Sequence, residues 1–101
     1  MDDTANYNDL SVANAGEVSG LTWYRATELA NDLVREMISY YAREIMKEEN
    51  NSTPNVERVA VLAKKQQEII AINNNPSSFA SLEQMNKIIE VLSPLVKQIY
   101  A

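Results

Sequence analysis

The stretch ENNSTPNVER, residues 49–58, separates two long helix-forming runs and so decides how the chain folds. Its asparagines favour the end of one helix. Thr53 can cap the next, with Pro54 at the first helical position, where a missing backbone N–H costs little. A connection this short makes the two flanking helices antiparallel neighbours. The Asn-Ser-Thr triplet at 51–53 also matches the N-glycosylation pattern, but no secretory signal precedes it and a proline follows, so we interpret the stretch as a helix–helix connection.

Upstream of this connection, residues 22–50 have the spacing of one long amphipathic helix. Apolar residues recur at alternating steps of three and four, which places them on one helix face. They are Trp23, Ala26, Ala30, Leu33, Met37 and Tyr40. A flanking set, Val34, Ile38, Tyr41 and Ile45, widens this face to about half of the helix at 100° per residue. A face this broad predicts contact with more than one neighbour.

Downstream, the sequence predicts a second helix over residues 54–73. Its main apolar face is interrupted by Gln66, which we interpret as a residue that fixes register between helices. Val61 and Ile72 project to another side of this helix. This second, thinner apolar face is either exposed or covered by a partner.

A third helix is predicted over residues 78–100, after an asparagine run and Pro76 end the second. Ser77 or Ser78 can cap it, and Ser81 followed by Gln84 is a further capping candidate. Its apolar residues keep the three–four alternation unbroken: Leu82, Met85, Ile89, Leu92, Val96 and Ile99. Pro94 is expected to bend or to end this helix.

These elements predict an all-α fold, a three-helix up-down-up antiparallel bundle in residues 21–101 behind a flexible acidic tail, residues 1–20. The tail holds four acids and no base, within a net charge of −5. Alternatively, the tail folds onto a partner through Tyr7, Leu10 and Val12. The first helix, about 42 Å long, exceeds the second, about 30 Å. The Trp23 end of the first helix is therefore expected to overhang.

The composition excludes several kinds of site. The chain has no cysteine and no histidine, which removes disulfides, thiolate ligands, the commonest metal ligand and the usual general base. We therefore expect no enzyme activity, no cofactor and no metal. No apolar run approaches the length of a membrane span, and the N-terminus lacks the features of a signal peptide. We expect a cytoplasmic protein without a membrane partner.

The leading hypothesis is a small non-catalytic protein-binding or assembly module that forms a homo-oligomer or binds another protein. The candidate partner-binding residues are Trp23 and Tyr24 on the overhang, with Val61 and Ile72 on the second helix. Tyr40 and Tyr41 are expected in the core. An acidic inhibitor, such as an immunity protein or an antitoxin, is a specific form of this hypothesis, in which the acidic tail steers association.

The alternative function is a transcriptional regulator that binds nucleic acid. The net charge of −5 makes nucleic acid an unfavourable direct partner. Binding would need a basic surface formed only in an oligomer, from Arg58, Lys64, Lys65 and Lys87.

Overall fold

The protein is all-α, as its sequence predicts. A computed structural model describes the backbone of residues 15–101 and the side chains from residue 22 onward. Three α-helices follow one another: α2 (Ala15–Glu49), α3 (Val56–Asn74) and α4 (Leu82–Ile99), with a short 3-10 helix η1 (Pro76–Phe79) before α4. Within this part of the chain there is no strand, and no helix combines the length and apolar character needed to cross a membrane.

Helix α2 is the longest element and organises the others. It begins at Ala15, seven residues before the expected start at 22, and its 35 residues span about 52 Å. Its C-terminal end at Glu49 lies within one residue of the expected end. The remainder of the predicted acidic tail, residues 1–14, lies outside the described residues.

The connection between α2 and α3 forms where expected, but the predicted cap is wrong. Asn55, rather than Thr53, caps α3, because its side-chain oxygen accepts a hydrogen bond from the Arg58 N–H at 3.0 Å. The Glu48 carboxylate in turn accepts the Asn55 N–H at 2.9 Å. Asparagine is also the stronger N-cap residue. Pro54 therefore lies in the loop and not at the first position of the helix.

The second connection is longer than predicted, because residues 76–79 form η1 before α4 begins. Asn75 caps η1 by accepting the Ser77 N–H at 3.0 Å. Ser81 caps α4 by accepting the Gln84 N–H at 3.1 Å, which confirms the Ser81 candidate and moves the helix start from 78 to Leu82. Helix α4 continues through Pro94 to Ile99, so this proline does not end it.

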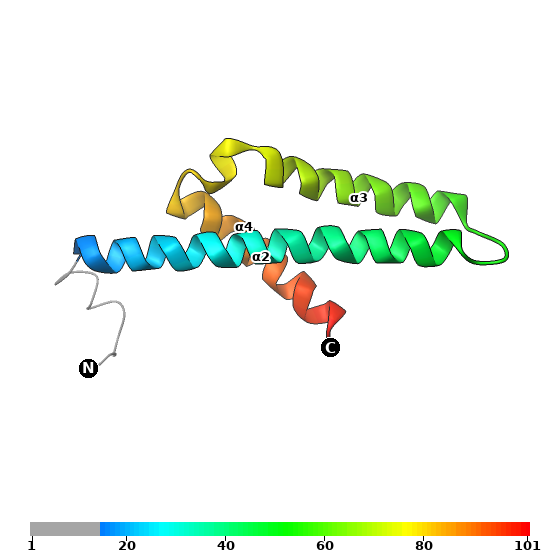
Figure 1. Ribbon diagram of the computed structural model, residues 1–101, viewed down its shortest axis with the longest axis horizontal. Helices are drawn as coiled ribbons and strands as arrows, with labels where there is room; N and C mark the ends of the chain where they lie inside the picture. Colours follow the sequence, from blue (N-terminus) through cyan, green and yellow to red (C-terminus); the bar gives the residue numbers. More distant parts are fainter. Residues whose placement is uncertain (1–14) are drawn as a thin grey trace.

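The helices are arranged around α2 in an up-down-up order. Helix α3 runs antiparallel to α2, beside its C-terminal part (Figure 1). Helix α4 crosses the middle of α2 and runs in the same general direction as α2 (Figure 1). Both α3 and α4 pack extensively on α2, whereas α3 and α4 make at most a weak contact with each other. The radius of gyration, 17.7 Å, exceeds the value of about 13 Å typical of a compact domain of this length. The bundle is therefore elongated and open.

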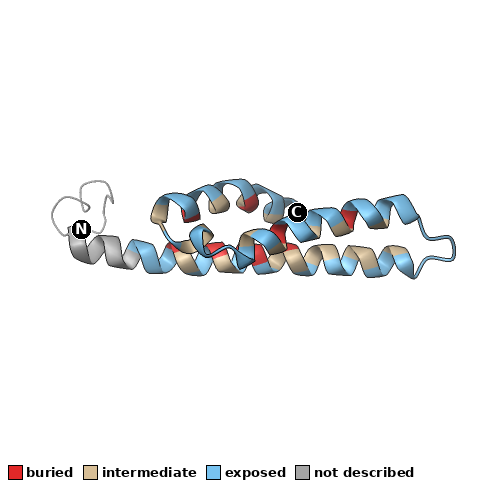
Figure 2. Ribbon diagram, turned by 90° about the horizontal axis from the view of Figure 1, so that it is seen from above, coloured by how far each residue is buried: buried red, intermediate tan, exposed pale blue. Residues whose placement is uncertain are grey.

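The core consists of two clusters along the middle of α2 (Figure 2). The larger joins all three helices through Leu33, Val34, Met37, Ile69 and Leu92. The smaller joins Met85 of α4 to Ala26 and Ala30 of α2, whose short side chains let α4 approach closely. Every buried residue in the described part is apolar.

One half-buried polar side chain links α2 to α3. The Gln66 amide of α3 donates a hydrogen bond to the Ile38 carbonyl of α2 at 3.1 Å. This bond ties one position of α3 to one turn of α2. It is the kind of contact that the register interpretation of Gln66 requires.

Candidate protein-binding site

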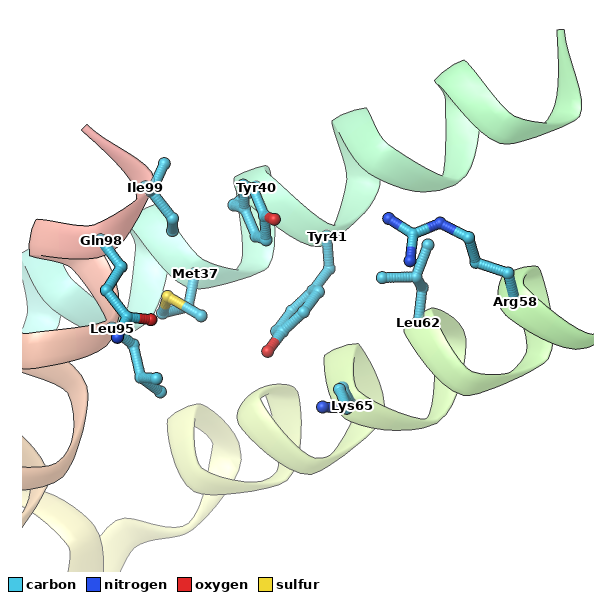
Figure 3. Close-up of a pocket in the computed structure, with 9 residues that line it drawn as sticks. All are labelled: Met37, Tyr40, Tyr41, Arg58, Leu62, Lys65, Leu95, Gln98 and Ile99. Carbon is cyan, nitrogen blue, oxygen red and sulfur yellow. The ribbon is translucent and has the colours of Figure 1, made fainter. Parts of the chain in front are cut away.

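An interhelical groove of about 430 Å³ lies where α3 and α4 diverge above α2 (Figure 3). Each helix contributes three residues to its lining. They are Met37, Tyr40 and Tyr41 from α2, Arg58, Leu62 and Lys65 from α3, and Leu95, Gln98 and Ile99 from α4. The groove exists because α3 and α4 each pack mainly on α2 and make at most a weak contact with each other.

Two tyrosines of α2 form much of the groove floor. The Tyr40 and Tyr41 rings lie 5.4 Å apart at 59°, in a tilted arrangement, and both pack against the larger core cluster. The prediction that they lie in the core is therefore confirmed in part, since their other edges line the groove. Burial, followed by the nearby Tyr40 and Glu68, raises the pKa of Tyr41 above its usual 10.0. Its hydroxyl is therefore protonated at neutral pH and can donate a hydrogen bond.

The α3 wall of the groove carries its only charged lining residues, Arg58 and Lys65. The Arg58 guanidinium reaches back to α2, with nitrogen–oxygen distances of 3.4 Å to both Glu44 and Glu48. These ion pairs hold Arg58 at the loop end of the groove. Lys65, two turns further along α3, makes no ion pair with any residue in the described part.

The α4 wall is uncharged. Leu95 is 37% exposed, and Gln98 and Ile99 follow it toward the end of the helix. This end is fastened to α2, because the Tyr100 hydroxyl donates a hydrogen bond to the Glu36 carboxylate. The same carboxylate lies 3.6 Å from the Arg43 guanidinium. The hydrogen bond to Glu36 is also the main reason that the pKa of Tyr100 is raised.

The structure separates the two candidate residues of the second predicted helix. Val61 is 53% exposed. It follows Arg58 by three residues and precedes Lys65 by four, so all three lie on one flank of α3, beside the groove. Ile72 is half-buried and packs against the larger core cluster. Val61 is therefore available at the groove edge, whereas much of Ile72 is already covered within the chain.

Trp23 and Tyr24 lie toward the N-terminal end of α2, where the sequence predicts an overhang. The N-terminal turns of α2 extend beyond both α3 and α4 (Figure 1), and these two side chains are 41% and 59% exposed. The Tyr24 hydroxyl donates a hydrogen bond to the Glu28 carboxylate at 3.0 Å, which raises the Tyr24 pKa. A second, more open hollow of about 450 Å³ lies nearby between α2 and α4. It is lined by Thr22, Arg25, Ala26, Leu29, Asn86 and Ile89.

About half of the charged side chains in the described part take part in ion pairs. Of the cations in the nucleic-acid hypothesis, Arg58 is held by α2 carboxylates and Lys87 lies 4.0 Å from Glu83. Two of the four cations of that hypothesis are therefore already paired within the chain. The described residues contain no group of three or more histidine, cysteine or acidic side chains placed to hold a metal ion.

Comparison with known proteins identifies no relative: no family model, no curated protein and no solved structure matches this chain. The interhelical groove is thus the main guide to function. The sequence hypotheses missed its α4 wall and favoured the core for its two tyrosines. The available signal was the breadth of the apolar face of α2, which exceeds what one neighbouring helix can cover.

Proposed function

We propose that this protein is a non-catalytic protein-binding module that takes up one amphipathic helix of a partner in the interhelical groove. The observation that supports this proposal is the groove itself, an unfilled space of about 430 Å³ in contact with all three helices. A fourth helix packed there would complete a four-helix arrangement. The groove lining is mixed, with the polar groups of Arg58, Lys65 and Gln98 beside apolar side chains, and grooves between helices can receive the two-sided surface of an amphipathic helix.

The lining has the composition that such binding requires. Met37, Leu62, Leu95 and Ile99 supply the aliphatic part of the lining, and the exposed Val61 lies on the same flank of α3 as Arg58 and Lys65. Tyrosine is enriched among residues that dominate binding energy, because it combines a large apolar ring with a hydroxyl donor. The two tyrosines on the floor would meet the centre of a docked helix.

Two narrower hypotheses receive less support from the groove. An acidic inhibitor of a basic target would use acidic surface, whereas the charged residues of the lining are Arg58 and Lys65. A nucleic-acid-binding regulator would need a basic surface that spans several copies of the chain. Each would place its partner outside the groove, so variants of the groove distinguish both from the proposal.

The proposal is tested with a displayed library of helical peptides, each about 20 residues long, with a fixed apolar seam and all other positions randomised. Peptides are selected against the full chain, and their Kd is measured by fluorescence anisotropy. Leu95→Glu places a charge on the groove wall. Leu29→Glu is the matched control, because Leu29 is also exposed but lines the second hollow.

We expect selected peptides to bind the unchanged chain, and Leu95→Glu to weaken them about tenfold or more. Leu29→Glu is expected to leave their Kd unchanged. Circular dichroism establishes that both variants remain folded. Failure to enrich any peptide, or equal weakening by the two variants, would overturn the proposal.

A further inference from the structure

The groove differs in charge from the rest of the molecule. The whole chain has a net charge of −5, yet the described residues that line the groove include two cations and no carboxylate, with Glu44, Glu48 and Glu68 beside the lining. Both cations lie on the α3 wall, and the α4 wall offers only Leu95, Gln98 and Ile99. The groove is therefore cationic on one side and uncharged on the other.

The two cations are not equivalent. Arg58 is engaged by Glu44 and Glu48 of α2, each at 3.4 Å. Lys65 has no such partner among the described residues and lies on α3 near Tyr41 (Figure 3). Lys65 is exposed in the free chain, and a docked helix would cover it, so an ion pair with that helix would be less screened than in open water. Lys65 is thus the position where a partner's carboxylate would be stabilised.

A second donor lines the same groove. The Tyr41 hydroxyl lines the groove and is not among the donors of any hydrogen bond within the described residues. An ammonium group and a hydroxyl that line the same space match the acceptors of a carboxylate. The apolar α4 wall, in contrast, matches the uncharged seam of the same helix.

We propose that the helix received by the groove is acidic, with its apolar seam against α2 and α4 and with aspartate or glutamate along the flank that faces Lys65. This inference rests on the proposed function and deepens it, because it states the chemistry of the partner. It follows from the combination of an uncharged α4 wall and an α3 wall whose Lys65 has no ion-pair partner among the described residues.

The test repeats the peptide selection with a library that offers acidic and basic residues at equal frequency outside the apolar seam. We expect enrichment of aspartate and glutamate over lysine and arginine. Lys65→Gln is expected to weaken the selected peptides about threefold, and Lys65→Glu about tenfold, since reversal adds repulsion to the lost pair. Lys64→Glu is the matched control, because Lys64 is the adjacent lysine and does not line the groove.

The outcomes separate the two proposals. Peptides that depend on Leu95 but show no acidic preference, with Lys65→Glu and Lys64→Glu equivalent, would overturn this inference and leave the proposed function in place. Selection of no Leu95-dependent peptide would overturn both. Light scattering at two protein concentrations tests whether a second copy of the chain fills the groove instead. A dimer that Leu95→Glu dissociates and Leu29→Glu does not would show this, and it would also overturn the inference.

Discussion

Leu92→Ala tests how much the larger core cluster contributes to fixing α4 on α2 and α3. Leu92 is 2% exposed and is the only α4 residue in the larger buried cluster, where it meets Val34 of α2 and Ile69 of α3. Removing its three terminal carbons forfeits about 2.4 kcal/mol of transfer free energy, at about 0.8 kcal/mol per carbon. The cavity left behind raises the expected loss to about 3–4 kcal/mol of unfolding free energy.

Leu95→Ala is the matched control, with the same chemical change on the same helix. Leu95 is 37% exposed and borders the groove, so its truncation opens no enclosed cavity. We expect it to cost about 1.5 kcal/mol. Urea unfolding followed by circular dichroism at constant m-value measures both. If Leu92→Ala costs no more than Leu95→Ala, the account of the core that positions α4, and with it the groove, is wrong.

Two further predictions concern the α2–α3 connection. The hydrogen bond from the Asn55 N–H is the largest reason that the pKa of Glu48 lies below its usual 4.5, and the bond from Asn51 is the second. The stabilisation that the ionised Glu48 carboxylate gives is therefore present above pH 4.5. It is lost as the pH falls through the lowered pKa. Glu48→Gln should therefore flatten the decline of melting temperature below pH 4.5; an unchanged acid profile would contradict this. Asn55→Ala should lower the free energy of unfolding, measured in urea, by about 1 kcal/mol, and Thr53→Ala should leave it nearly unchanged, because Asn55 is the cap of α3. A larger loss for Thr53→Ala would show that Thr53 caps the helix, as the sequence predicts.

Helices and their order follow from the sequence because they depend on local spacing. The three–four alternation of apolar residues locates α2, α3 and the body of α4, and Ser81 with Gln84 identifies a true cap. Errors occur at the ends. Both Thr53 and Asn55 are acceptable caps by composition, and the choice depends on the Glu48 carboxylate, which only the folded hairpin brings to the Asn55 N–H.

The groove is harder to predict, because it depends on the angle at which α4 crosses α2. Ala26 and Ala30 let Met85 approach closely at one end of α4, and the Tyr100–Glu36 hydrogen bond fixes the other end. Neither contact is visible in helix periodicity. The sequence did place Trp23 and Tyr24 on an overhang and Val61 on a secondary face, but it could not show that Ile72 packs on the core whereas Val61 lies beside a groove.

The most direct test of the central claim is the location of a bound acidic peptide, measured by two-dimensional NMR of the nitrogen-15-labelled chain. The account predicts that the largest amide shifts occur around Met37, Tyr41, Lys65 and Leu95, with the Trp23 indole signal unchanged. The largest shifts at Trp23, with unchanged groove amides, would contradict it and assign binding to the overhang of α2.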